Sequence, residues 1–226
     1  MIETVEIGVI ATDDGNDHVR RARPFIEAGL PVFVDKPMAI NVPDLRQFIR
    51  WQRDGARILS NSGMRYAPEI RDVAARRDEL GDLRWITSFT CKTWERYGIH
   101  ALEAVQPLVG PGFESVQTNY RDGSDIVQVV HRSGVQLTLA AVHDAYGSFG
   151  GVHLYGTKGQ TALTLRDTYH AFRGQLVAFI EFLQTGKRQY PFEETIELMA
   201  IIIAGIRSRE QGGRMVKLDE VLGDLE

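Results

Sequence analysis

The first sixty residues alternate short apolar runs with segments of helical pattern, and this alternation restricts the fold more than any other feature of the chain. Residues 5–11 predict a buried strand, residues 17–28 predict a helix that ends at Gly29, and residues 32–34 predict the next strand. Strands this apolar, separated by helices, are typical of a parallel sheet covered on both faces. We therefore expect part of a doubly wound sheet.

A different pattern begins after Gly63. Residues 68–80 predict an amphipathic helix, and the hairpin signals that follow, such as Asp122-Gly123, separate stretches in which apolar and polar residues alternate. This period of two predicts a mainly antiparallel sheet with one buried face. Two helices with apolar stripes close the chain. We expect a second domain that begins near residue 63, with the last helices packing as a layer or against the first domain.

Charge and cysteine content exclude several classes of partner. The net charge is −4, from 26 basic and 30 acidic residues, so there is no field that attracts nucleic acid or an anionic membrane surface. The longest uncharged apolar stretch near the C-terminus, residues 198–206, is far shorter than the ~20 residues of a membrane-spanning helix. The single cysteine, Cys91, cannot form an internal disulfide. We expect a cytoplasmic protein with a small-molecule ligand, and the scattered histidines predict no metal site.

Polar residues follow the first two predicted strands. Ala11 and Thr12 come at the end of the first strand, and Asp35-Lys36-Pro37 comes at the end of the second. Because ligands bind at the carboxyl edge of an open parallel sheet, we expect Thr12 and Lys36 to face one crevice. A lysine there can donate to a ribose or substrate hydroxyl. The alternative is an ordinary solvated lysine that follows a strand.

A histidine lies near the start of a helix whose apolar stripe begins at Ile99. His100 and Glu103 are three residues apart, so they share one face of this helix. The positive end of a helix dipole disfavours a cation, so His100 can accept a proton near neutral pH, as a general base must. The alternative is a core histidine with Glu103 as its surface partner. Nearby, Trp94 and Tyr97 either stack on the apolar face of a sugar ring or fill the junction of sheet and helix.

The order and spacing of five segments resemble the glucose-fructose oxidoreductase and inositol dehydrogenase (Gfo/Idh/MocA) family over essentially the whole chain. The segments are Ile10-Ala11-Thr12, Ala28-Gly29, Val34-Asp35-Lys36-Pro37, Gly63-Met64-Arg65-Tyr66-Ala67-Pro68 and Gly98-Ile99-His100-Ala101-Leu102-Glu103. The resemblance implies an α/β plus α+β fold. Residues 1–62 would be the C-terminal part of a Rossmann-type nucleotide-binding domain. Residues 63–226 would form a substrate-binding domain whose large, mainly antiparallel sheet, flanked by helices, also builds a homo-oligomer.

The resemblance also implies an activity, oxidation or reduction of a sugar, cyclitol or related polyol with NAD or NADP, and roles for individual residues. Lys36 would act at the nicotinamide and the substrate, and His100 would be the base. The cofactor-binding residues would be Ala11, Thr12, Asp35, Lys36, Pro37 and Arg65. The substrate-binding residues would be Tyr66, Trp94, Tyr97 and Glu103. For Arg65 and Tyr66 the alternative is an interdomain contact.

The chain departs from the family pattern in two places. No Gly-x-Gly-x-x-Gly turn, which would hold the pyrophosphate, precedes the first strand, so we expect either a fragment or misassigned start, or a true truncation that has lost tight cofactor binding. Arg96 stands four residues before His100, where many members carry an aspartate, and Glu95 would point elsewhere. The rival hypothesis is therefore a non-catalytic ligand-binding or oligomerisation module.

Overall fold

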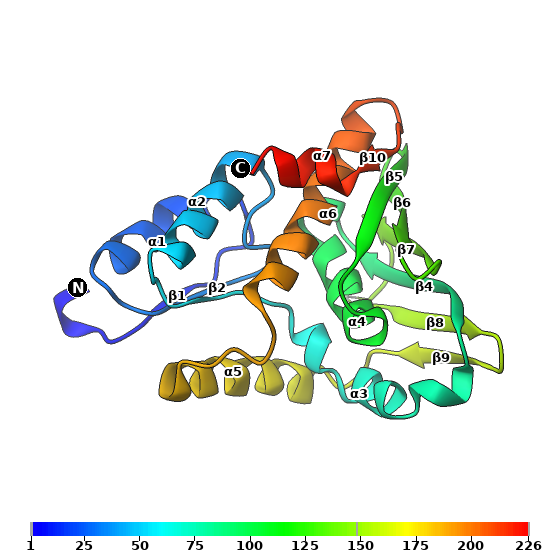
Figure 1. Ribbon diagram of the computed structural model, residues 1–226, viewed down its shortest axis with the longest axis horizontal. Helices are drawn as coiled ribbons and strands as arrows, with labels where there is room; N and C mark the ends of the chain where they lie inside the picture. The colour runs from blue at the N-terminus through cyan, green and yellow to red at the C-terminus, as the bar shows by residue number, and fades with distance from the viewer. Residues whose placement is uncertain (1, 148, 226) are drawn as a thin grey trace.

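The computed structural model describes residues 2–147 and 149–225 and contains two sheets (Figure 1). The smaller sheet has three parallel strands in the order β1-β2-β3. The strands are β1 (Gly8–Ile10), β2 (Val32–Val34) and β3 (Ile58–Leu59). The helices between them are α1 (His18–Glu27) and α2 (Val42–Arg53). The strand expected over residues 5–11 is confirmed only in its second half, and a 3-10 turn, η1 (Ile2–Thr4), lies ahead of it.

Helices cover both faces of the small sheet. In Figure 1, α1 and α2 lie above the strands, and α5 (Thr168–Thr185), which comes much later in the chain, lies below them. Between the small sheet and α5, the rings of Phe33 and Phe179 pack with their centroids 5.4 Å apart. Leu59 and Phe182 complete this apolar cluster. The expected doubly wound arrangement is therefore present.

The larger sheet has seven strands in the order β10-β5-β6-β7-β4-β8-β9. Neighbouring strands are antiparallel except β4 and β7, which are parallel, so the expected mainly antiparallel sheet is confirmed. The strands are β4 (Leu83–Cys91), β5 (Phe113–Arg121), β6 (Ser124–His131), β7 (Gln136–Val142), β8 (Gly151–Gly156), β9 (Gln160–Thr164) and β10 (Val216–Lys217).

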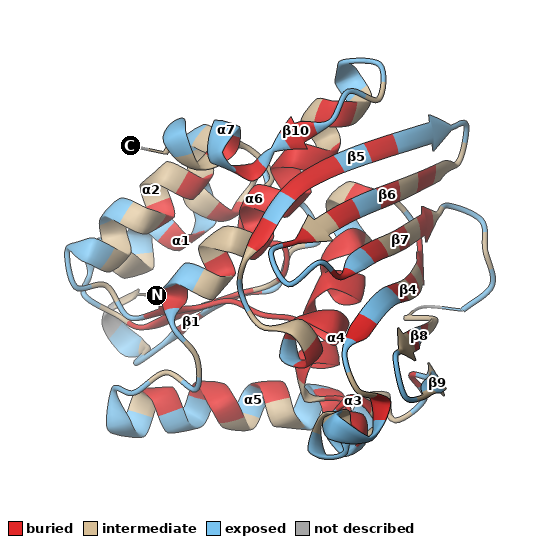
Figure 2. Ribbon diagram, turned by 45° about the vertical axis from the view of Figure 1, so that its right-hand side comes forward, coloured by how far each residue is buried: buried red, intermediate tan, exposed pale blue. Residues whose placement is uncertain are grey.

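One face of this sheet packs against helices. Figure 2 shows buried and more exposed residues alternating along its strands, as a sheet with one covered face requires. In β7, for example, Leu137, Leu139 and Ala141 are buried. The covering helices are α4 (Ile99–Val109) and α6 (Phe192–Glu210). The chain ends with α7 (Leu218–Gly223).

Two expected segments differ in detail. The single helix expected over residues 68–80 is divided into α3 (Pro68–Ala75) and a 3-10 turn, η3 (Arg77–Leu80), because Arg76 leaves the helical conformation. A π-helical turn, η4 (Trp94–Gly98), replaces the expected loop before α4. A further 3-10 turn, η2 (Gly63–Tyr66), connects the two sheets.

Helix α6 runs between the two sheets and contacts both α2 and β5 (Figure 1). The residues of α6 from Leu198 to Ala204 are all buried, and they belong to a hydrophobic core that extends from β1 to α7. Through its contact with α2, α6 packs against the layer of helices that covers the small sheet. Within residues 2–147 and 149–225, no helix is long and apolar enough to cross a membrane.

A glycine in α6 makes room for an indole ring. The Trp94 side chain is 1% exposed and its Nε1 donates to the Ile202 carbonyl at 3.1 Å. A Cβ atom at Gly205 would lie 2.4 Å from Trp94 Nε1, and one at Gly98 would lie 2.4 Å from Trp94 Cε3. Because these rigid neighbours cannot yield, glycine is required at both positions.

We predict that Gly205→Ala destabilises the protein by about 1–3 kcal/mol, the usual cost of overpacking, although alanine is the better helix former. Gly223→Ala in α7 is the matched control, because an added Cβ there meets no atom within 4 Å. Urea unfolding monitored by circular dichroism measures both. A Gly205→Ala protein as stable as the control would contradict the packing described for Trp94.

Candidate active site

The loops after β1 and β2 meet at the carboxyl edge of the small sheet, as expected for parallel strands. His18, which is fully buried, connects them: its Nε2 lies 2.9 Å from the Thr12 carbonyl oxygen and its Nδ1 lies 3.2 Å from the Met38 carbonyl oxygen. Ala11 is exposed beside Thr12. The histidine therefore fixes the two loops that carry Thr12 and Lys36.

Lys36 is 7% exposed, so the alternative of an ordinary solvated lysine is wrong. Its ammonium lies 3.4 Å from Asp13 Oδ1 and 3.4 Å from Asp35 Oδ2. Pro37, which follows through a cis peptide bond, is buried. The ammonium therefore lies within ion-pair distance of carboxylates from the loops after both β1 and β2.

The ring of Tyr97 brings the lysine and the histidine together. Lys36 Nζ lies 5.2 Å from the centroid of this ring. The His100 imidazole packs edge-on against the same ring with a centroid distance of 4.7 Å. Lys36, which follows β2, and His100, which lies in α4, therefore belong to one side-chain cluster although they are far apart in the sequence.

His100 is held inside the protein as a neutral imidazole. It is 2% exposed, and its Nδ1 shares a hydrogen bond of 2.7 Å with Ser62 Oγ. Burial, and after it the positive charges of Lys36 and Lys92, lowers the pKa of His100 well below 6.5. The ring of Phe149 covers another edge of the imidazole at a centroid distance of 4.8 Å. Two aromatic rings therefore pack against the imidazole, which is almost closed to solvent.

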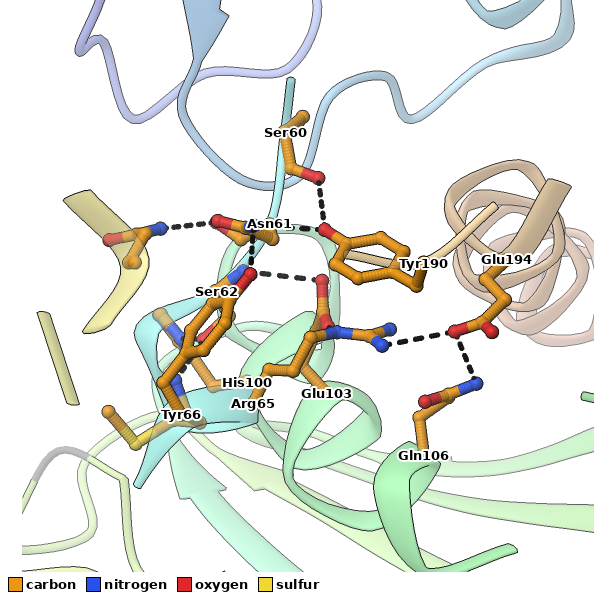
Figure 3. Close-up of polar contacts among 12 residues, drawn as sticks. Ser60, Asn61, Ser62, Arg65, Tyr66, His100, Glu103, Gln106, Tyr190 and Glu194 are labelled. Carbon is orange, nitrogen blue, oxygen red and sulfur yellow. Dashed lines mark hydrogen bonds and ion pairs between the residues drawn. The ribbon is translucent and has the colours of Figure 1, made fainter. Parts of the chain in front are cut away.

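A buried ion-pair network lies behind His100 (Figure 3). Arg65 Nε bonds to Glu103 Oε2, and Arg65 Nη1 donates to Glu194 Oε2 at 3.0 Å. The other oxygen of Glu103 accepts from the backbone N–H of Ser62 at 3.2 Å. Burial raises the pKa of Glu103, and the guanidinium of Arg65 opposes that rise. Ser62, which bonds to His100, is therefore connected to α6 through Glu103 and Arg65.

Glu103 is not a surface partner of His100, because it is 2% exposed and pairs with Arg65. The alternative of a core histidine is thus right about the burial of His100 but wrong about its partner. The guanidinium of Arg65 likewise bonds to internal carboxylates of α4 and α6, Glu103 and Glu194.

The phenol of Tyr66 lies in a second group of polar residues beside this network. Asn61 Nδ2 donates to the hydroxyls of Tyr66 and Tyr190 at 2.8 and 2.9 Å. Burial raises the pKa of both phenols, that of Tyr190 to about 12. Tyr66 lines a cavity of about 750 Å³ between α3, α4 and α5, and Asn61 rather than Lys36 or His100 bonds its hydroxyl.

Trp94, Glu95 and Arg96 point in three different directions. Trp94 fills the junction between sheet and helix, so the alternative of a sugar-stacking Trp94 does not describe its position. Glu95 turns away to pair with Arg209. Arg96, which is 54% exposed in its side chain, lies 3.8 Å from Asp13 Oδ2. The residue in place of the expected aspartate thus approaches a carboxylate from another strand end.

Sequence reasoning missed four residues of this region. Asp13 follows Thr12 directly, so the carboxyl-edge rule could have found it. Ser62 caps η2 by accepting from the Met64 N–H at 3.0 Å, and a cap is also readable from sequence. Tyr190 and Glu194 carry no local signal, because they contact residues 129 positions away.

No family model and no curated protein matches the chain. Solved structures do match its backbone. A myo-inositol dehydrogenase from Corynebacterium glutamicum superposes with a TM-score of 0.77 at 18% identity, over 95% of this chain and 80% of the other. The GenD2 protein of gentamicin A biosynthesis, in complex with NAD, gives 0.82 at 18% identity, over 95% and 79%. The chain shares the fold of these two proteins.

A third neighbour has the same architecture. An oxidoreductase from Agrobacterium radiobacter, in complex with NAD+, L-tartaric acid and magnesium, gives a TM-score of 0.80 at 13% identity, over 97% of this chain and 82% of the other. At such identities the similarity establishes the fold. The reaction has to be inferred from the side chains of this chain. Among the residues that the structure describes, no three His, Cys, Asp or Glu side chains are grouped so that they could hold a metal ion.

Because the folded pKa of His100 is lowered, protonation of the unfolded chain below pH 6.5 draws the equilibrium toward unfolding. The contribution of a neutral His100 is complete above that pH and is lost as the pH falls. We predict that the free energy of unfolding of the wild type decreases more between neutral and mildly acidic pH than that of His100→Asn. Urea unfolding at a series of pH values tests this, and parallel pH dependences would contradict it.

Removal of one partner from the buried Arg65–Glu103 pair leaves an uncompensated charge. We predict that Arg65→Met destabilises the protein by about 3–5 kcal/mol at neutral pH. The deficit should shrink in acidic buffer, where Glu103 becomes protonated. Arg84→Met is the control, because the Arg84 side chain is 61% exposed and lies 3.5 Å from an exposed Asp82. Equal stability of the two variants in urea would overturn the role given to the network.

Proposed function

We propose that this chain belongs to an oxidoreductase that transfers a hydride between NAD or NADP and a hydroxyl-bearing or carbonyl carbon of a sugar, cyclitol or related polyol. One observation carries the proposal: the Lys36 ammonium and a neutral His100 imidazole lie against one Tyr97 ring. An amine that donates and an imidazole that accepts are the pair needed to orient a hydroxyl and take its proton. The fold shared with a myo-inositol dehydrogenase, and with two proteins solved in complex with NAD, supports the proposal.

The carboxyl edge of the small sheet fits the nicotinamide end of such a cofactor. Thr12 Oγ1 is buried there and has no hydrogen-bond partner among the described residues. Ala11, Thr12, Asp35, Lys36 and Pro37 would hold this end, next to the Lys36 ammonium. The sequence offers no glycine turn for the pyrophosphate, so these residues supply only part of the usual contacts. When bound, the nicotinamide supplies or accepts the hydride.

The side chains of this chain then handle the hydroxyl and its proton. Lys36, whose ammonium lies 3.4 Å from both Asp13 Oδ1 and Asp35 Oδ2, donates a hydrogen bond to the substrate oxygen and orients it. His100 takes the hydroxyl proton at Nε2 during oxidation and returns it during reduction, while Nδ1 carries the ring proton and donates it to Ser62 Oγ. Ser62 fixes the ring by its hydrogen bond to Nδ1. Burial of the imidazole keeps water away from the reacting atoms.

We further propose that the chain divides after residue 62 into a nucleotide-binding part and a part that binds substrate and forms a homo-oligomer. The uncovered face of the larger sheet supports this assembly. On it, Trp85 is 44% exposed and stacks on Tyr155 at a centroid distance of 5.1 Å. Exposed aromatic pairs of this kind are enriched at protein interfaces.

We predict that Lys36→Met and His100→Asn each lower kcat by about 10²-fold or more, the range of general acid–base catalysis. Absorbance of the reduced nicotinamide, measured with a panel of sugars and inositols, reports the turnover. Lys187→Met is the control, because Lys187 is exposed at the end of α5. Full turnover in either site variant would remove these roles.

Fluorescence titration with the reduced dinucleotide separates the enzyme from a non-catalytic module. Saturable binding that Lys36→Met weakens is expected for the enzyme. Absence of both binding and turnover in the wild type would overturn the proposed function.

A further inference from the structure

Lys92 adds a second ammonium group to the cluster around Tyr97. It follows β4, and its Nζ donates to the Tyr97 hydroxyl at 2.8 Å and lies 4.2 Å from the ring centroid. This hydrogen bond raises the pKa of Lys92, which therefore stays charged. Lys92 is also the one non-glycine residue in the described part of the chain with a positive φ, 62°. Such a conformation is costly for a lysine and marks a position that its surroundings hold in place.

The ring of Tyr97 is already occupied by its neighbours. Lys36 and Lys92 both lie over it, and the Phe149 ring runs parallel to it at a centroid distance of 6.3 Å. Two ammonium groups therefore lie over the ring on which the apolar face of a sugar would stack. Recognition of a ligand here depends instead on the charged groups at the rim of the cluster.

These charged groups leave an excess of positive charge. Lys36, Lys92 and Arg96 are the cations, and Asp13 and Asp35 are the carboxylates. Both carboxylates pair with Lys36, and Asp13 is also shared with Arg96 at 3.8 Å. No carboxylate of the described residues lies within ion-pair distance of Lys92, whose polar partner is the neutral phenol. Asp13 also acts on Lys92 through space, but the carboxylates within ion-pair distance of these three cations belong to Lys36 and Arg96.

The acidic side chains on the far side of Lys92 do not form an ion pair with its ammonium. Lys92 lines a cavity of about 550 Å³ together with Glu95, Asp122 and Asp125. Both Glu95 and Asp125 are bound to Arg209, the latter at 3.1 Å. Asp122 is exposed at the hairpin between β5 and β6, whereas the Lys92 ammonium is directed to Tyr97.

We infer that Lys92 is a specificity-determining residue that binds a carboxylate of the substrate, so that the preferred substrate is a sugar acid rather than a neutral polyol. The inference rests on the proposed function for its chemistry and names the substrate class of the same site. The substrate carboxylate would complete the charge balance at Lys92. Its hydroxyl-bearing carbons would then lie toward Lys36 and His100.

D-Glucuronate and D-glucose form a matched pair for the test, because they differ only in the carboxylate. We predict that kcat/KM of the wild type favours glucuronate, that Lys92→Met lowers this preference roughly five- to tenfold, and that Lys92→Arg restores it. The change should lie in KM, and added salt should reduce the preference of the wild type. Lys187→Met should keep the preference. Equal use of both sugars by the wild type, or an unchanged preference in Lys92→Met, would overturn the inference.

Binding without cofactor distinguishes failure of the inference from failure of the proposed function. In NMR titrations of the whole chain, glucuronate should shift the ring signals of Tyr97 in the wild type more strongly than glucose does, and Lys92→Met should abolish the difference. Saturable binding of glucuronate without turnover would support the carboxylate site and contradict the oxidoreductase. Turnover of neutral polyols alone, with no glucuronate binding, would support the oxidoreductase and contradict the carboxylate site.

Discussion

The burial of α4 is the constraint on which the rest of the site depends. This helix lies between the larger sheet and the loop after β3, and all but two of its residues, Pro107 and Val109, are buried, including His100 and Glu103. Polar groups in such a position need internal partners, since each unpaired one costs about 1–3 kcal/mol. Ser62 satisfies both residues at once, with its hydroxyl on His100 and its backbone N–H on Glu103. The position of the imidazole is thus a consequence of packing.

A second consequence concerns charge. A histidine buried next to ammonium groups loses its tendency to protonate, and one of those groups, the Lys36 ammonium, lies between two carboxylates. The loops after β1 and β2 provide those carboxylates because parallel strands bring their carboxyl ends to one edge. The loop after β2 therefore positions the Lys36 ammonium, and α4 positions the His100 imidazole. Both side chains lie against the Tyr97 ring.

Much of this could be predicted from the sequence where the signal is local. Apolar runs separated by helices indicated the small parallel sheet. The position of Lys36 after a strand placed it at the carboxyl edge of that sheet. The apolar stripe that begins at Ile99 predicted that His100 lies near the start of a helix. Trp94 was harder, because its burial depends on space left by Gly98 and Gly205, and Gly205 is more than a hundred positions away.

Long-range pairs explain the rest of what sequence reasoning did not find. Arg65 was expected near the cofactor, but its carboxylate partners come from α4 and α6, and only the packed structure brings them to it. The charge of a single residue does not reveal whether its partner is internal. Lys92 shows the opposite case, in which a lysine with no motif around it contacts the ring at the centre of the site.

The central claim is that Lys36 and His100 share one cluster around Tyr97. Nuclear Overhauser effects in a labelled sample test it most directly, because they depend on distance alone. The protons of the Tyr97 ring should show cross-peaks both to the Lys36 side-chain methylenes and to the His100 ring. Cross-peaks from Tyr97 to only one of these two residues, in a folded sample, would contradict the claim.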